Sequence, residues 1–345
     1  MLSMKILLKN AKILTMIDEN IFNGDVAIEN NRILKVSKTR LKDKDFDQVI
    51  DCEGNLLMPG FKNAHAHSAM TFLRSVADDS SLHDWLFKEI FPREDNLHDG
   101  CIRELSKVAI LEYLTSGITA CIDQYFFIKE FKETCLELGF RSVTLGMYDK
   151  DSRPTPLLLD YYKEFNDTDL AKMVIGLHSE YTIDQNMIDE TAILLKKTKS
   201  PFYVHLSETS SEVSECIKRR GKTPLEFFDS LNFFENGGAI FHGVYLSVHD
   251  YEILRDKNIV VVSCPASNMK LASGICDITT LLEKGCTVAL GTDGPASNNG
   301  LDMFREMYLA TGLQKLLYKV SAVIGSSYSA LSHSLRKFAH HSPVL

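Results

Sequence analysis

The sequence lacks features that define several common classes of protein. Its 345 residues contain no uninterrupted run of about 18 apolar residues, so no segment is predicted to span a membrane. The 38 Lys and Arg residues are outnumbered by 46 Asp and Glu residues, which gives a formal net charge of −8. An acidic chain without a basic run is a poor partner for a nucleic-acid polymer, although it can still process a free nucleoside.

The eight cysteines form no C-x-x-C pair. The sequence therefore predicts neither a structural zinc knuckle nor a disulfide framework, and we expect reduced thiols in a cytoplasmic protein. Residues 1–14 lack the long apolar stretch and the small-residue cleavage site of a signal peptide. With 45% hydrophobic and 24% charged residues, the composition is typical of a soluble globular protein.

Residues 1–58 are predicted to form a small β domain. The apolar pieces 6–8, 13–15, 26–28 and 33–36 are rich in residues that favour strands. Asn30 and Asn31 separate the last two pieces, and asparagine tolerates the left-handed backbone that a tight hairpin needs.

Residues 59–319 show a different pattern, in which short apolar runs alternate with longer amphipathic stretches. Eight runs are predicted as strands: 60–64, 119–123, 142–146, 173–177, 202–206, 238–241, 259–262 and 287–290. Helical periodicity lies between most of them, for example at 103–116, 188–197 and 212–220. The repeated order predicts an α/β fold with a parallel sheet, and eight units fit a (β/α)8 TIM-like barrel. A doubly wound sheet is the competing architecture, but it favours a glycine-rich turn that the Lys-Asn-Ala-His sequence at 62–65 does not supply.

Polar side chains follow several predicted strands, at the barrel mouth where such enzymes build their active sites. His65 and His67 are two residues apart, so in an extended backbone both imidazoles can reach one ion. His205 ends the fifth strand, Glu208 follows three residues later, and Asp293 follows the eighth strand. Each alone has an ordinary structural explanation, such as a chance pair, a core histidine or a turn aspartate.

The joint pattern is more informative than any single residue. Three histidines and one aspartate after strands one, five and eight would converge at one mouth, and His178 and His242 end two further strands. Such a group leaves room for a bound water, which is typical of a catalytic metal site rather than a closed structural one.

Four motifs then carry a resemblance to a known family. They are Pro-Gly-Phe-x-Asn-x-His-x-His at 59–67, His-Leu-Ser-Glu at 205–208, Cys-Pro-Ala-Ser-Asn at 264–268 and Gly-Thr-Asp-Gly-Pro-Ala-Ser-Asn at 291–298. In this order they resemble the amidohydrolase superfamily, most of all its 5-methylthioadenosine/S-adenosylhomocysteine deaminase branch. The resemblance covers about residues 4–319.

The resemblance implies one divalent metal ion, most often zinc, held by His65, His67, His205 and Asp293. Members with two metals carry a bridging lysine at the end of strand four, and no lysine stands there beside His178.

The resemblance also implies the roles of the remaining residues. Glu208 matches the proton-shuttling glutamate, His242 the histidine that orients the attacking water, and His178 the residue that touches the purine. Metal-activated water would attack C6 of an adenine-type nucleoside, with Asp293 steering its proton, and release the inosine analogue and ammonia.

Residues 82–94 resemble the segment that folds over the ligand in this branch, in which Glu94 matches the glutamate that accepts hydrogen bonds from the ribose hydroxyls. Some relatives place an arginine just after strand three, where this chain has Gly146, and we expect Arg153 to serve nearby instead. This departure leaves 5-methylthioadenosine at least as good a candidate as S-adenosylhomocysteine, with adenosine as a third.

Residues 320–345 are rich in serine and histidine and show no strand or helix period, so we expect an irregular tail. Relatives continue with helices and with strands that complete a β-sandwich with the N-terminal strands. We therefore expect an incomplete sandwich, and we interpret the chain as truncated or frame-shifted.

Two alternatives to an adenine-nucleoside deaminase stay open. One is an amidohydrolase of another aminated or chlorinated heterocycle, such as guanine, cytosine or a triazine. The other is a truncated, non-catalytic barrel, although such relatives lose metal ligands that this chain keeps. The expected partner is a small-molecule nucleoside, with neither a nucleic-acid polymer nor a membrane, and a homo-oligomer stays open.

Overall fold

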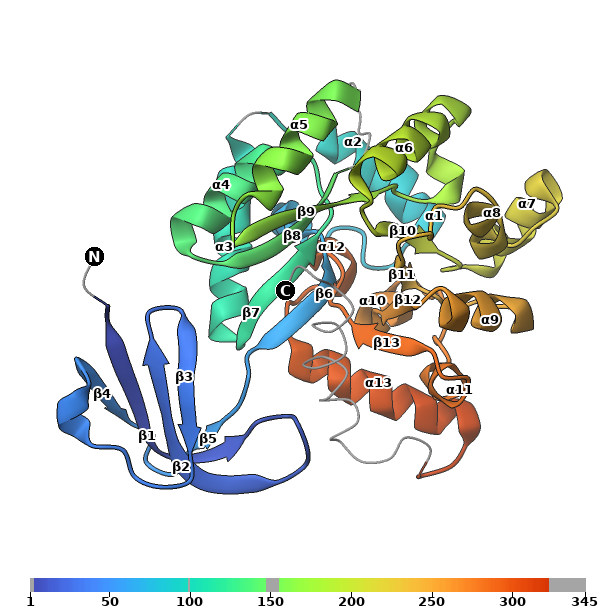
Figure 1. Ribbon diagram of the computed structural model, residues 1–345. Coiled ribbons are helices and arrows are strands. Elements are labelled where there is room, and N and C mark those ends of the chain that lie inside the picture. Colours follow the sequence, from blue (N-terminus) through green and yellow to red (C-terminus); the bar gives the residue numbers. More distant parts are fainter. Residues whose placement is uncertain (1–2, 99, 147–154, 323–345) are drawn as a thin grey trace. The chain divides into compact units, whose positions relative to one another are not determined.

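The N-terminal strands form one mixed sheet in the computed structural model, which describes residues 3–98, 100–146 and 155–322. The strands are β1 (Lys5–Leu14), β2 (Ile21–Glu29), β3 (Arg32–Ser37), β4 (Gln48–Asp51) and β5 (Leu56–Leu57). Their order is β3-β2-β1-β4, and β5 pairs with β1 (Figure 1). The sheet belongs to the first of two compact units, Met1–Gly60 and Phe61–Leu345.

Strand β1 joins two pieces that the sequence predicted as separate strands, so that prediction was wrong. The register against β2 shifts between Leu8 and Ala11, and Asn10 at this bulge has a φ of 61°. A bulge adds one residue without ending the strand, which explains why the polar interruption did not mark a turn. The predicted hairpin is confirmed: Asn30 lies between β2 and β3 with a φ of 54°.

The N-terminal sheet buries one cluster and exposes another apolar group. Ala11, Ile13 and Val26 are buried together, whereas Ile33 and Leu34 of β3 are 69% and 56% exposed. From residue 323 on, the predicted irregular tail lies outside the described residues.

The second unit contains the predicted parallel sheet of eight strands, and the TIM-like α/β fold is confirmed. The strands are β6 (Phe61–Ala66), β7 (Ile118–Asp123), β8 (Arg141–Gly146), β9 (Ala171–Gly176), β10 (Phe202–Leu206), β11 (Gly238–His242), β12 (Ile259–Ser263) and β13 (Thr287–Leu290). They are hydrogen-bonded in sequence order from β6 to β13, and their inward side chains, such as Val143, Val174 and Phe241, form the core.

Contacts between the first and last strands bring the sheet round toward a barrel. The backbone N–H of Asp293, just after β13, donates to the carbonyl of His65 in β6 at 3.0 Å. The side chain of Asn63 donates to Thr292 Oγ1 at 2.6 Å and accepts from the Thr292 backbone N–H at 2.9 Å. These contacts hold His65 and Asp293, two residues far apart in the sequence, next to each other where the first and last strands meet.

Helices surround the eight-stranded sheet (Figure 1). The main ones are α3 (Cys101–Thr115), α4 (Ile128–Leu138), α5 (Thr155–Asn166), α6 (Gln185–Thr198), α7 (Ser210–Arg220), α8 (Pro224–Ser230), α9 (Val248–Asp256), α10 (Pro265–Lys270), α11 (Ile278–Glu283), α12 (Pro295–Asn298) and α13 (Met303–Tyr318). Helices α3, α6 and α7 confirm the three that the sequence predicted. Helices α6 and α7 begin at N-capping residues. The side chains of Asp184 and Thr209 accept hydrogen bonds from backbone N–H groups in the first turns of α6 and α7.

Short helical segments complete the unit. Three of them run on from one another between β6 and β7: α1 (Leu82–Asp84), the π-helical η3 (Trp85–Ile90) and α2 (Phe91–Glu94). The 3-10 helix η2 (Ser68–Leu73) precedes them in the same connection, and the single turn η4 (Glu180–Thr182) follows β9. The single turn η1 (Asp43–Asp45) belongs to the N-terminal unit. None of the helices in the described ranges is long and apolar enough to cross a bilayer.

Candidate functional site

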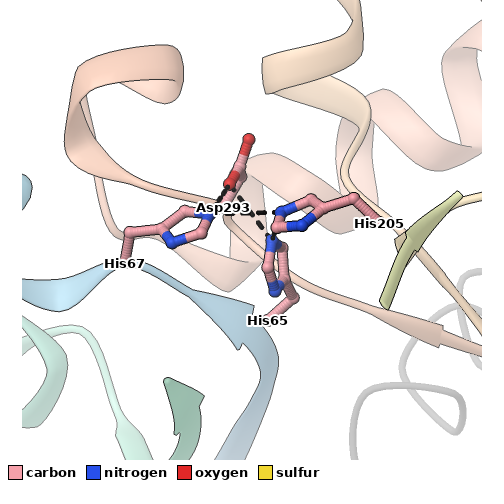
Figure 2. A group of neighbouring side chains, drawn as sticks. All are labelled: His65, His67, His205 and Asp293. Carbon is pink, nitrogen blue, oxygen red and sulfur yellow. Dashed lines mark hydrogen bonds and ion pairs between the residues drawn. The ribbon is translucent and has the colours of Figure 1, made fainter. Parts of the chain in front are cut away.

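Four side chains gather at the C-terminal ends of the barrel strands. His65, His67, His205 and Asp293 each offer one ligand atom, and these atoms lie within 4.8 Å of one another. Figure 2 shows all four side chains pointing toward a common centre. Asp293 Oδ1 lies 3.2 Å from His65 Nε2 and 3.1 Å from His67 Nε2, while His205 Nε2 lies 3.0 Å and 3.3 Å from the same two nitrogens.

The strands fix where these side chains point. His65 lies within β6 and His67 directly follows it, so the two-residue spacing puts both rings on one side of the strand, as predicted. His205 lies within β10. Asp293 has a φ of 60°, a left-handed backbone that aspartate tolerates better than most residues and that turns its side chain into the group.

The second ring nitrogen sets the tautomer of His67 and of His205. His67 Nδ1 faces the carbonyl of Gln124, and His205 Nδ1 donates to the carbonyl of His178 at 2.8 Å. A carbonyl only accepts, so each Nδ1 carries the proton and each Nε2 directs a lone pair into the group. His65 is held differently: its ring stacks on Phe241 with centroids 3.7 Å apart.

The donor set fits a divalent cation. Burial lowers the pKa of His65 to about 3 and holds the pKa of His205 well below its usual value, so both rings are neutral. Facing lone pairs on neutral imidazoles repel unless a cation lies among them, and imidazole nitrogen with one carboxylate oxygen is a common ligand set. These residues form a metal site.

Asp293 enters this site as a carboxylate. Burial opposes its charge, but the neighbouring His65 and His67 rings hold its pKa well below the usual range. Ser267 and Ser297 donate to its other oxygen, Oδ2, at 2.6 Å and 2.7 Å. Oδ1 is thereby left turned toward the histidines.

Glu208 and His242 stand beside the metal site. His242 Nε2 lies 3.7 Å from Glu208 Oε2, and His242 Nδ1 donates to Asn268 Oδ1 at 2.7 Å. In its neutral form His242 therefore presents an accepting Nε2. Burial and the nearby Asp293 carboxylate raise the pKa of Glu208, which favours its protonated form and suits a group that takes up and releases a proton.

Glu212 supports this part of the site and was missed by the sequence reasoning. Its two carboxylate oxygens accept from the backbone N–H groups of Ser207 and Glu208, both at 2.8 Å. The Thr209-to-Glu212 spacing is a capping-box signature and could have drawn attention to it. That signature predicts a bond to the Thr209 backbone, and the carboxylate also holds the two residues before it.

The metal site opens into a pocket that several predicted residues line. Among its lining residues are Leu82, Trp85, Leu86, Phe91, Glu94, Gln124, Tyr125, His178, Glu208 and His242. Glu94 and Tyr125 are both buried, and the Tyr125 hydroxyl donates to Glu94 Oε1 at 2.7 Å. The structure therefore gathers Glu94, His178, Glu208 and His242 around one space with three of the four metal ligands, His67, His205 and Asp293.

Two residues stand apart from this agreement. Arg153, which the sequence offered as a substrate contact, lies outside the described residues. Tyr125 was not predicted at all, because its strand end at β7 carries no motif beyond Asp123-Gln124-Tyr125.

Comparisons with known proteins agree with this geometry. The sequence profile of the Amidohydrolase family matches residues 56–332, which reaches past Lys319, where we expected the likeness to end. The chain is 38% identical over 322 residues to a 5-methylthioadenosine/S-adenosylhomocysteine deaminase of Thermococcus sibiricus, covering 91% of this chain and 75% of the relative. It is 37% identical over 304 residues to a 5′-deoxyadenosine deaminase of Methanothrix thermoacetophila, covering 88% and 73% of the two chains.

A solved structure agrees with the fold and itself contains a metal ion. The crystal structure of an adenosine deaminase from Xanthomonas campestris with bound zinc superposes with a TM-score of 0.86 at 27% identity. The superposition covers 96% of this chain and 78% of that one.

Proposed function

Because this chain belongs to the amidohydrolase family of metal-dependent enzymes, we propose that it deaminates adenine-type nucleosides by hydrolysis. The proposed substrates are 5-methylthioadenosine, S-adenosylhomocysteine, 5′-deoxyadenosine and adenosine, the compounds in the names of its relatives. One observation carries the proposal: Glu208 and His242 line the same pocket as three of the metal ligands and as the buried pair Glu94 and Tyr125.

We propose one zinc ion per chain at His65, His67, His205 and Asp293. No lysine is among the described residues that line the pocket, which supports a single ion over a bridged pair. When bound, such an ion lowers the pKa of water and so supplies a hydroxide nucleophile at neutral pH.

The protein's own groups move the protons. Glu208 takes one proton from the attacking water and gives it to a ring nitrogen, while the water oxygen forms the new bond to C6. Asp293 takes the second water proton and passes it to the amino group. The C6–N bond then breaks, ammonia leaves with its electron pair, and the ring keeps a C6 carbonyl and a protonated nitrogen.

The other side of the pocket gives the proposed preference for nucleosides over free bases. Glu94 is a buried acceptor oriented by the Tyr125 hydroxyl, and a carboxylate is a strong acceptor for ribose hydroxyls. His178, whose pKa burial lowers to about 4, is a neutral ring that we assign to the purine. The eight free thiols are in keeping with the cytoplasmic location that we propose.

A substrate panel on metal-analysed protein tests the proposal. Ammonia release is measured with the four nucleosides, with guanine and with an aminated triazine, and the metal content is determined on the same sample. We expect turnover of at least one nucleoside and little of guanine or the triazine. Preferred turnover of a free heterocycle would move the chain to another substrate class, and no turnover in a fully metallated sample would favour the non-catalytic alternative.

A further inference from the structure

We propose that Ser273 is a positioning residue that fixes the Glu208 carboxylate and decides which of its two oxygens carries the proton. The proposal rests on the proposed function in one respect, namely that Glu208 moves a proton during turnover. Ser273 lies in the loop after α10. It belongs to none of the four sequence motifs that carry the family resemblance.

The two oxygens of Glu208 have different surroundings. Ser273 Oγ donates to Oε1 at 2.8 Å, and both side chains are buried, Ser273 at 2% and Glu208 at 5% exposure. Oε2 instead faces His242, with 3.7 Å to its Nε2. A proton on Oε1 would compete with the hydroxyl hydrogen of Ser273, so Oε2 is the oxygen that carries the proton in the pocket.

Backbone contacts alone leave this carboxylate free to turn. Glu212 holds the backbone N–H groups of Ser207 and Glu208, but a glutamate side chain has three rotatable bonds beyond its backbone. In the described part of the chain, Ser273 is the residue whose side chain donates a hydrogen bond to the Glu208 carboxylate. Its hydroxyl therefore supplies the orientation that the backbone clamp does not.

One segment holds both proton-handling groups. The Ser273 backbone N–H donates to the carbonyl of Asn268 at 2.9 Å, and the Asn268 side chain accepts from His242 Nδ1 at 2.7 Å. Asn268 and Ser273 thus anchor His242 and Glu208 from the same stretch of chain. A shift of this stretch would move both groups together, whereas loss of the Ser273 hydroxyl alone releases only Glu208.

A second cavity beside Ser273 makes its hydroxyl more important for orienting Glu208. This cavity, of about 600 Å³, is lined by Ser273 and Glu212 and shares Leu82, Leu86, Tyr181 and Leu271 with the metal pocket. Ser273 lines only the second cavity, while its hydroxyl reaches Glu208 of the first. The serine thus presents one fixed donor to Glu208 where water from the second cavity would offer several shifting ones.

A double-mutant cycle in the holoenzyme tests the proposal. With 5-methylthioadenosine as substrate, Ser273→Ala is expected to lower kcat about 10- to 100-fold with KM little changed, the scale of a lost hydrogen bond to a charged group. In a Glu208→Gln background the same change is expected to cost less than about threefold, because a residue that acts through Glu208 has nothing left to position. Equal losses in both backgrounds would overturn the proposal.

A matched control separates positioning from general packing. Ser106 is buried in α3 with no hydrogen-bond partner for its hydroxyl among the described residues. Ser106→Ala removes the same atom from another buried site and is expected to leave kcat unchanged. Metal content is measured for every variant, and loss of the metal in Ser273→Ala would count against the proposal, since it would assign Ser273 to the fold of the metal site.

A structural measurement keeps the proposal independent of the substrate. If the wild-type protein turns over no nucleoside, the proposed function fails, but crystal structures of metallated wild type and Ser273→Ala still test the positioning. We expect the Glu208 carboxylate to rotate away from its wild-type place in the variant. A carboxylate that keeps the same place and the same two oxygen environments would overturn the proposal.

Discussion

The metal pocket has two walls that are built in different ways. The strand wall consists of residues at or just past strand ends: His67, His205, Glu208, His242 and Asp293. The helical wall consists of residues from the continuous helical segments between β6 and β7: Leu82, Trp85, Leu86, Phe91 and Glu94. The first is a polar surface on a rigid sheet, and the second is a mostly apolar surface on short helices.

Hydrogen bonds hold the strand wall. Asp293 accepts from two serine hydroxyls, His242 donates to Asn268, and Glu208 accepts from Ser273. Every reactive group therefore has a second contact that fixes its direction, which is the condition for a pre-organised catalytic site.

Packing holds the helical wall instead. Trp85 is 4% exposed, and its Nε1 has no hydrogen-bond partner among the described residues. Glu94 is the polar member of this wall, and Tyr125 orients it. We propose that the strand wall carries out the chemistry and that the helical wall selects the substrate, so changes to the two walls are expected to affect kcat and KM differently.

The largest effect is expected from loss of a metal ligand on the strand wall. His67→Ala is expected to release the metal and to bring turnover below detection, because a site with few protein ligands holds zinc weakly once one is lost. Metal analysis and ammonia release measure both. As a control, His249→Ala removes an exposed histidine that pairs with Glu252 and is expected to keep the metal. A His67→Ala protein that binds one ion and turns over normally would remove His67 from the ligand set.

The next largest effect concerns proton transfer on the same wall. Glu208→Gln is expected to keep the metal, since Glu208 is not a ligand, and to lower kcat by at least about 10²-fold, the scale of a positioned acid or base. Steady-state kinetics and metal analysis check it. The matched change Glu215→Gln, in a largely exposed glutamate on α7, is expected to be neutral. Near-normal kcat in Glu208→Gln would place the proton shuttle elsewhere.

The strand wall was largely predictable from the sequence. Strand patterns placed His65, His205 and Asp293 at one mouth because parallel strands of a barrel share one end. The eight predicted strands all occur in the structure within a few residues of their predicted bounds. Topology alone therefore brought residues together that are as far apart in sequence as positions 65 and 293.

The supporting contacts were not predictable in the same way. Ser273, Glu212 and Tyr125 act through one or two hydrogen bonds whose partners depend on loop conformation rather than on periodicity. The bulge in β1 was not predicted for a related reason. One left-handed residue, Asn10, changes the register of β1 against β2 without a turn motif in the sequence. Sequence patterns give the side of a strand or helix, and they do not give the rotamers and loop turns that complete a site.

A smaller effect is expected on the helical wall. Glu94→Ala is expected to lower kcat/KM for nucleosides about 10- to 100-fold, mostly through KM, because charge-assisted hydrogen bonds to the ribose are lost. Adenine, which has no ribose, is expected to be affected little. The control Glu89→Ala changes a partly exposed glutamate of the same segments that pairs with Arg93. Equal losses for adenosine and adenine would exclude Glu94 from ribose binding.

The smallest effect is expected from Tyr125→Phe, which removes only the hydroxyl that orients Glu94. Burial raises the pKa of Tyr125 well above its usual value, so the hydroxyl stays protonated and donates to Glu94 Oε1 at 2.7 Å across the pH range of an assay. Its loss leaves the ring and its packing in place. We expect KM for adenosine to rise about threefold to tenfold with kcat unchanged, the scale of one oriented hydrogen bond.

The decisive measurement is the combination with Glu94→Ala, because a hydroxyl that acts through Glu94 has no further effect once that carboxylate is gone. Tyr308→Phe, at a largely exposed tyrosine of α13, serves as the matched control and is expected to leave KM unchanged. If Tyr125→Phe lowers kcat for adenine as well as for adenosine, then the hydroxyl acts on the strand wall, and the separation of the two walls into chemistry and substrate choice is wrong at this position.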